Sequence, residues 1–321
     1  MFLSGPRVSR ALSAFDYARH RWAAIPFRDP TRPRSANAHD VGRQTLSLTS
    51  WNINASQSGQ VERSRLILDH ILEGPKRPDV IHLQEVASSV RQSLLSDARV
   101  RSSFLATDAE DDTAFKGVQF ATMTLLSNER FATPVLAEKK DGSGGEGEGE
   151  GEGGSKLVLD SVFRMELASR YRRDALGVDI CHPAVPGAFL RLFNVHLDSL
   201  DSQFRRWIQI HVLDGLLREP GCGGGVIAGD FNAIHPDDYT LVDEHGLVDA
   251  WVALHGSTAP PGGGATWGVG ASLADGLKPG RLDKVVMLGL QPIAIEVLTP
   301  GLVNAHTPWS DHCGLHCTFA V

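Results

Sequence analysis

The sequence predicts an α/β protein, and three observations support this. Residues 45–53 and 79–85 are short runs rich in apolar and β-forming side chains, which is typical of buried strands. Between them, residues 61–73 carry apolar side chains at helical spacing and stop before a Gly-Pro pair. A strand, a helix of this length and a second strand indicate a β-α-β unit. With 321 residues, the chain could form one large α/β domain or two ordinary ones.

The alternation of strands and helices continues along the chain. Residues 226–232 follow a Gly-rich stretch and are predicted to form a central buried strand. Helices are expected at 88–98 and 202–217. Further strands are expected near 118–127 and at 157–166, 175–181, 189–197, 281–287 and 315–321.

Charge and composition exclude several classes of protein. The net charge of −7 argues against a protein that binds nucleic acid through overall basicity, but it leaves room for a local basic rim. No run approaches the roughly 20 apolar residues of a membrane span. Four scattered cysteines indicate reduced thiols in an intracellular protein, nuclear or cytoplasmic. The cluster His312-Cys313-x-x-His316-Cys317 fits no common zinc signature.

Two segments interrupt the strand pattern. Residues 1–43 are rich in Arg and broken by prolines, and we interpret them as an N-terminal arm that packs onto the domain. A mitochondrial presequence is the alternative for this segment. Residues 138–156 contain Gly-Glu repeats with six acidic residues and three lysines, so they supply −3 of the net charge. We predict a disordered surface insertion there, within one catalytic domain over 44–321.

Polar side chains stand at the ends of the predicted strands. Asp230 and Asn232 alternate with an aromatic residue and therefore share one face of the central strand. Asn52 and Glu85 end the first two strands, and His196 ends a later one. A carboxylate or amide at the end of a core strand is costly to bury without partners or a function. Each residue alone fits an ordinary hydrogen-bonded role, but their joint occurrence indicates a site.

The residue types at these positions favour metal-assisted hydrolysis of a phosphoester. A cation such as Mg²⁺ prefers oxygen ligands and needs only one or two protein carboxylates, for which Glu85 with Asn52 beside it is the best candidate. Asp230 together with Asn232 suits the orientation or deprotonation of the attacking water.

Two histidines complete the predicted chemistry. A charged His312, held in one tautomer by Asp283, would stabilise the phosphate, and His196 would provide a second donor. Either Asp230 or His312 could transfer the proton, and the sequence leaves both alternatives open.

These residues belong to six short motifs that follow one another in a specific order: Trp51-Asn52-Ile53, Leu83-Gln84-Glu85-Val86, Asn194-Val195-His196-Leu197, Gly229-Asp230-Phe231-Asn232, Arg281-Leu282-Asp283 and Ser310-Asp311-His312. As a set, from about Ser47 to Phe319, they resemble the endonuclease/exonuclease/phosphatase superfamily. The resemblance implies a four-layer α/β sandwich in which helices flank two packed mixed β-sheets. It also implies Mg²⁺, or Mn²⁺ in its place, at Asn52 and Glu85, with Asp311 near the ion.

Within the superfamily, the chain resembles most the 5′-tyrosyl-DNA phosphodiesterases. Its Ser310-Asp311-His312-Cys313-Gly314-Leu315 is similar to their Ser-Asp-His-Trp-Gly-Leu, with Cys313 in place of the aromatic residue. The histidine at 196 argues against the apurinic endonuclease branch, which typically has tyrosine there. The resemblance implies three substrate contacts, Arg173, Arg206 and Trp267.

The sequence therefore predicts a monomeric, Mg-dependent phosphodiesterase that hydrolyses phosphodiesters at DNA 5′ ends. The first alternative is a phosphoesterase of the same superfamily that acts on a lipid headgroup, an inositol phosphate or RNA. The second is a catalytically silent binding module. We disfavour the second because a silent site has no physical need for clustered polar groups that are costly to bury.

Overall fold

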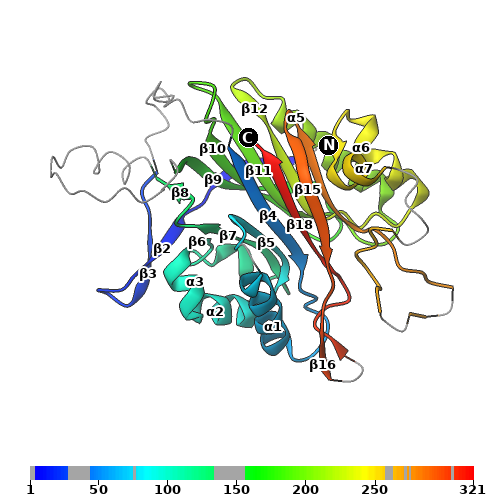
Figure 1. Cartoon of the computed structure of the whole chain (residues 1–321), viewed down its shortest axis with the longest axis horizontal. Helices are drawn as coiled ribbons and strands as arrows, with labels where there is room; N and C mark the ends of the chain where they lie inside the picture. The colour runs from blue at the N-terminus through cyan, green and yellow to red at the C-terminus, as the bar shows by residue number, and fades with distance from the viewer. Residues whose placement is uncertain are drawn as a thin grey trace.

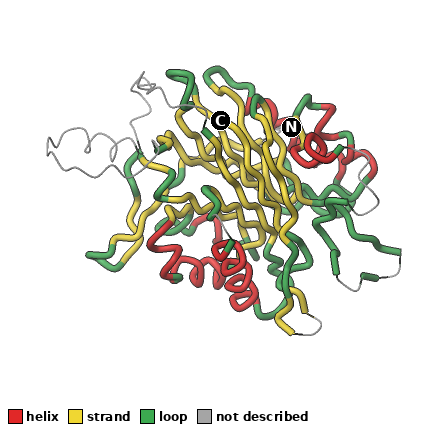
Figure 2. Tube along the Cα trace, in the orientation of Figure 1, coloured by secondary structure: helices red, strands yellow, loops and turns green. Residues whose placement is uncertain are grey.

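Two β-sheets pack face to face at the centre of the protein, and helices cover both outer faces (Figures 1 and 2). This arrangement is the expected four-layer α/β sandwich of two mixed sheets. The computed structural model describes residues 4–27, 44–74, 77–133, 156–256, 263–270, 273–274, 276–304 and 307–321. In these ranges, no helix has the length and apolar character that a membrane crossing requires.

The first sheet carries His196, Asp230 and Asp283 of the predicted site residues. Its strands lie in the order β1 (Ser4–Ser9), β9 (Leu157–Leu167), β10 (Asp174–Cys181), β11 (Phe189–His196), β12 (Cys222–Asp230), β14 (Asp283–Leu288) and β13 (Val248–Asp249), with β8 (Phe131–Ala132) paired to β9.

The second sheet carries Asn52 and Glu85. Its order is β15 (Gln291–Leu298), β18 (Gly314–Ala320), β4 (Thr45–Asn52), β5 (Val80–Val86), β7 (Ala121–Ser127), β6 (Phe104–Thr107), β2 (Leu12–Asp16) and β3 (Arg21–Ala24). A separate two-stranded sheet consists of β16 (Leu302–Asn304) and β17 (Thr307–Pro308).

The helices form the two outer layers and the connections around the site. They are α1 (Gln60–Glu73), α2 (Ser88–Ser96), α3 (Ala98–Ser103), α5 (Gln203–Leu217), α6 (Leu241–Glu244) and α7 (Ala250–His255), with 3₁₀ turns η1 (Thr113–Phe115) and η2 (Pro236–Tyr239). The predicted helix at 88–98 is thus α2, which is followed directly by α3. The predicted helix at 202–217 is confirmed as α5.

Three apolar layers hold the sandwich together, and strand alternation assigns side chains to them. On β5, Val80 packs into the layer between the two sheets, whereas the next residue, Ile81, packs against α1 and α2. On β12, Ile227 packs into the third layer, under α5. Because these strands are buried on both faces, they appear in the sequence as nearly continuous apolar runs.

Two β-α-β units, one in each sheet, place the predicted site residues. In one unit α1 connects the parallel strands β4 and β5, and in the other α5 connects the parallel strands β11 and β12. In register, Asn52 pairs with Gln84, and His196 pairs with Asp230. Parallel strands end at the same edge of a sheet, so each unit brings its polar terminal residues together.

The N-terminal segment contributes strands to both sheets. β1 pairs with β9 in the first sheet, while β2 pairs with β6 in the second. Phe15 and Trp22, on the neighbouring strands β2 and β3, pack edge to face with ring centroids 5.7 Å apart. Residues 4–24, predicted as part of an arm, are therefore built into the sandwich. The predicted insertion at 138–156 lies outside the described residues except for Lys156.

Polar side chains also lie between the sheets, directly below the strand ends. The Gln84 amide nitrogen donates to Asn194 Oδ1 at 2.8 Å and to Ser50 Oγ at 3.1 Å. The Asn194 amide nitrogen donates in turn to the Met123 carbonyl at 2.9 Å. Buried hydrogen bonds are directional, so this cluster favours one register of the two sheets over others.

His82 lies on the same face of β5 as Gln84, and burial lowers its pKa to about 3. An unfolded histidine titrates near 6.5, so below that pH the unfolded chain binds one more proton than the folded chain. We therefore expect the contribution of His82 to the free energy of unfolding to fall as the pH drops from about 6.5 towards 3.

His82→Gln removes this titration. Chemical denaturation of wild type and variant at a series of pH values below about 6.5 should give slopes that differ by up to about 1.4 kcal/mol per pH unit. If the free energy of unfolding depends on pH in the same way in both proteins, His82 binds its proton equally in the folded and unfolded states.

Candidate active site

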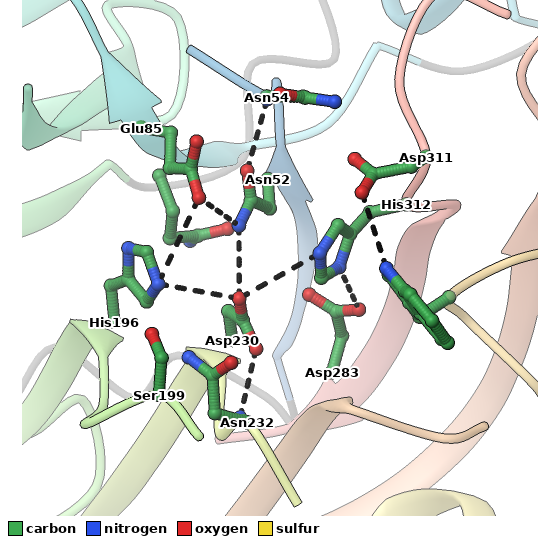
Figure 3. A network of polar contacts seen from close by, with 12 residues as sticks. Asn52, Asn54, Glu85, His196, Ser199, Asp230, Asn232, Asp283, Asp311 and His312 are labelled. Carbon is green, nitrogen blue, oxygen red and sulfur yellow. Dashed lines mark hydrogen bonds and ion pairs between the residues drawn. The ribbon is translucent and has the colours of Figure 1, made fainter. Parts of the chain in front are cut away.

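Side chains from four strand ends converge at one point between the two sheets (Figure 3). Asn52 comes from β4, Glu85 from β5, His196 from β11 and Asp230 from β12. The Asn52 amide nitrogen donates to Asp230 Oδ2 at 2.9 Å and to Glu85 Oε1 at 3.2 Å. A single amide group therefore joins carboxylates that belong to different sheets.

The orientation of the Asn52 amide follows from the backbone beside it. Its oxygen accepts the N–H of Asn54 at 3.0 Å, which turns the nitrogen towards the two carboxylates. Ser310 Oγ donates to the Asn52 carbonyl at 2.7 Å, so the segment that carries Asp311 and His312 is tied to the same strand end. Asn52 thus orients Glu85 and Asp230 through its amide nitrogen.

Glu85 is turned into the site by an irregularity of β5. The pairing of β5 with β7 shifts register between Leu83 and Val86, and Glu85 has a φ of 56°. Bulges and left-handed residues of this kind redirect a side chain out of the regular strand alternation. The N–H of Ala55 donates to Glu85 Oε2 at 2.8 Å, and the side chain stays 18% exposed. Glu85 therefore keeps an accessible carboxylate.

Asp230 is almost completely buried and is held by its own backbone turn. Its Oδ1 accepts the N–H of Asn232 at 2.8 Å, and Asn232 has a φ of 49°. Burial raises the pKa of Asp230 to about 7, since the opposing effect of His312 is smaller and Asp283 acts in the same direction as burial. A carboxylate with a pKa near neutrality is suited to proton transfer.

His312 and Asp283 form the pair that the sequence analysis expected. His312 Nδ1 lies 2.8 Å from Asp283 Oδ2, and its Nε2 lies 3.9 Å from Asp230 Oδ2. Burial acts to lower the pKa of His312, but the negative charges of Asp283 and Asp230 outweigh burial and raise it to about 10. His312 is therefore positively charged at neutral pH.

His196 differs from the expectation that it would be a second donor. Burial, together with the positive charges of Arg173 and His312, lowers its pKa well below the usual value. Arg173 Nη2 lies 3.0 Å from His196 Nε2, and arginine can only donate, so His196 is a neutral acceptor at this atom. Arg173 brings the second positive charge and also donates to Ser199 Oγ at 2.9 Å.

A cavity of about 310 Å³ opens beside His196 and contains groups that the sequence analysis missed. Phe120 stacks on His196 with ring centroids 5.7 Å apart, and the Arg173 guanidinium carbon lies 5.3 Å from the Phe120 centroid. Tyr171 lies on the rim, 5.6 Å from the same guanidinium. Phe120 and Tyr171 come from loops without a strand-end pattern, so no sequence signal marked them.

The remaining predicted residues have different surroundings. Trp267 Nε1 donates to Asp311 Oδ2 at 3.1 Å, so the loop that carries Trp267 lies against the segment 310–312. Arg206, predicted as a substrate contact, is fully buried and cannot reach a substrate. It binds both carboxylate oxygens of Asp238 at 2.7–2.8 Å and donates to the carbonyls of Asp198 and Leu200. Arg206 lies on the inward face of α5 and is therefore a structural residue.

The oxygen ligands around Glu85 fit a hard divalent cation. Glu85 offers a partly exposed carboxylate oriented by Asn52, and Asp311 is a second acidic group on the opposite side of the site (Figure 3). Mg²⁺ prefers such oxygen ligands. Asp230, Asp283 and His312 also offer ligand atoms within 4.8 Å of one another. Because His312 is charged and already paired with Asp283, we interpret that trio as an ion-pair network.

Comparison with known proteins identifies the family. The model of the endonuclease/exonuclease/phosphatase family matches residues 49–312, which include every strand end described above. The chain belongs to the endonuclease/exonuclease/phosphatase family. Members of this family are metal-dependent hydrolases of the phosphodiesterase and nuclease type, and so is this protein. A search of curated protein sequences finds no match.

Solved structures share the fold at low sequence identity. Zebrafish (D. rerio) TDP2, complexed with a single-strand DNA product, is 20% identical with a TM-score of 0.61, over 86% of this chain and 98% of that chain. Truncated Caenorhabditis elegans TDP2 is 18% identical with a TM-score of 0.60 over the same shares. The human Nocturnin catalytic domain with a bound sulfate is 19% identical with a TM-score of 0.55, over 90% and 98%.

Removal of the two central groups should abolish most of the activity. Asp230→Asn removes the carboxylate that titrates near neutrality, and His312→Ala removes the positive charge, so each should lower kcat by about 10²-fold or more. Steady-state kinetics on a phosphodiester substrate, with circular dichroism to confirm folding, would measure this. The matched controls Asp69→Asn and His255→Ala change a half-exposed and an exposed residue outside the site and should retain wild-type rates. Near wild-type rates in Asp230→Asn would reject its assigned role.

Proposed function

We propose that the protein is a magnesium-dependent phosphodiesterase that hydrolyses phosphodiesters at DNA 5′ ends, including one linked to tyrosine. The convergence of Glu85, Asp230 and the charged His312 around the Asn52 amide carries this proposal. The shared fold supports the substrate class, because one structure with this fold holds a single-strand DNA product.

The cation site contributes charge neutralisation. Mg²⁺ bound at Glu85 would neutralise phosphate charge and polarise a phosphoryl oxygen, which makes the phosphorus more susceptible to attack. Asn52 keeps the Glu85 carboxylate turned towards this position, and the Ala55 N–H fixes the other carboxylate oxygen. Asp311, on the adjacent segment, lies on the side of the site opposite Glu85 (Figure 3).

The remaining groups provide water activation and transition-state stabilisation. Asp230, with a pKa of about 7, accepts the proton of the attacking water as the new phosphorus–oxygen bond forms. Charged His312 and Arg173 stabilise the negative charge on the phosphoryl oxygens while the bond from phosphorus to the ester oxygen breaks. The ester oxygen leaves as an alkoxide, or as a phenoxide in the case of tyrosine, and takes a proton from water. In this mechanism Asp230 accepts the proton of the attacking water, because His312 is already protonated.

The cavity beside His196 supports an aromatic group next to the reacting phosphate. Phe120 and Tyr171 offer ring faces, and Arg173 lies over both. A guanidinium next to an aromatic ring is favourable through cation–π attraction. A phenol ring of a tyrosyl leaving group, or a nucleobase, would have complementary surroundings there.

A substrate panel tests this proposal. With Mg²⁺, a 5′-tyrosyl oligonucleotide should be hydrolysed faster than an abasic duplex or sphingomyelin. A chelator should remove the activity, and added Mg²⁺ or Mn²⁺ should restore it. Faster hydrolysis of sphingomyelin or of the abasic duplex would overturn the substrate assignment. Absence of divalent-ion binding would favour a silent binding module.

A further inference from the structure

Arg63 is a buried cation with no carboxylate partner among the described residues. It lies in the first turn of α1, and its residue exposure is 1%. Other fully buried arginines pair with acids, as Arg191 does with Asp179 and Arg206 with Asp238. An unpaired buried charge is costly, so strong compensating contacts must hold Arg63 in place.

Backbone carbonyls provide that compensation. A guanidinium group has five N–H donors in a fixed planar geometry. All five are used: Nε donates to the carbonyl of Ser58 at 3.1 Å, Nη1 to those of Ile53 at 3.0 Å and Trp309 at 2.6 Å, and Nη2 to those of Asn54 at 2.6 Å and Gln57 at 3.0 Å.

The five carbonyls come from the two segments that form the proposed cation site. Four belong to the loop 53–58, whose N–H groups at 54 and 55 bind Asn52 and Glu85. The fifth belongs to Trp309, directly before the segment 310–312 that carries Asp311 and His312. Arg63 thus fixes the distance between the loop that orients Glu85 and the segment that presents Asp311.

The charge of Arg63 does not by itself favour the site. A positive charge near a bound cation weakens cation binding by Coulomb repulsion. A favourable contribution from Arg63 must therefore come from its directional hydrogen bonds. Lysine at this position would keep the charge but offers only three donors on a flexible chain.

We propose that Arg63 is the positioning residue of the cation site: it holds the loop 53–58 and the segment 309–312 at the spacing that lets Glu85, oriented by Asn52, and Asp311 bind one divalent ion. This inference rests on the proposed function, because it assumes that the ion binds at Glu85. Arg63 touches neither substrate nor ion, so it acts only through the two segments.

Arg63→Lys tests the proposal, with Arg191→Lys as the matched control. Arg191 is also buried and hydrogen bonded, but it lies near the start of β11, away from His196. Both substitutions should lower the unfolding temperature. In calorimetric titration with Mn²⁺ and no substrate, Arg63→Lys should bind Mn²⁺ at least about tenfold more weakly than the wild type, which is the effect typical of groups that orient metal ligands. Arg191→Lys should bind Mn²⁺ as the wild type does.

Kinetics provide a second measurement. A purely structural role of Arg63 would leave the Mn²⁺ dependence of the rate unchanged. For Arg63→Lys, the Mn²⁺ concentration that gives half the maximal rate should rise by about the same factor as the dissociation constant. KM for the phosphodiester at saturating Mn²⁺ should stay at the wild-type value. Wild-type Mn²⁺ affinity in folded Arg63→Lys, or an equal loss in Arg191→Lys, would overturn the proposal.

A measurement on the wild type covers the case in which Arg63→Lys does not fold. Mn²⁺ should slow amide hydrogen exchange of residues 53–58 and 310–312 together, because Arg63 links them. Protection of only one of these segments would overturn the proposal. If the wild type binds no Mn²⁺ and hydrolyses no phosphodiester, the proposed function itself fails. If it does both, and Arg63→Lys matches it, only the role of Arg63 fails.

Discussion

The active site depends on one amide group, that of Asn52, placed between two carboxylates from different sheets. Glu85 and Asp230 would repel each other at this depth, and the Asn52 N–H groups give both a common donor. The position of Asn52 in turn depends on packing of the sheets, because β4 and β12 meet only across the central apolar layer. The packing of the two sheets therefore also fixes the relative positions of the residues in the active site.

Two buried histidines have different charge states in this site. His312 faces Asp283 and Asp230 and is protonated, whereas His196 faces Arg173 and is neutral. Burial acts to deprotonate both: at His312 the two carboxylates outweigh it, whereas at His196 the positive charges of Arg173 and His312 add to it. The site thus combines fixed positive charge at His312 and Arg173 with a carboxylate, Asp230, that titrates near neutrality. This distribution suits the hydrolysis of an anionic ester.

Much of the fold was predictable because its strands are apolar and end in polar residues. The segments 45–53, 61–73 and 79–85 correspond to β4, α1 and β5. The strands β1 to β3 escaped prediction because all three are short and partly exposed, and β1 and β3 are edge strands, so they carry no continuous apolar run. The strand β15 was missed for the same reason, since most of its residues are not buried.

The sequence by itself determined which polar residues end the core strands, because strand periodicity and the cost of burial are local properties. Only the tertiary structure decided what each residue does there. Arg206 binds the buried Asp238, Phe120 lies beside His196, and Arg63 joins the nearby loop 53–58 to Trp309, 246 residues away. Such roles depend on contacts between residues far apart in the chain, and spacing along the sequence contains no record of those contacts.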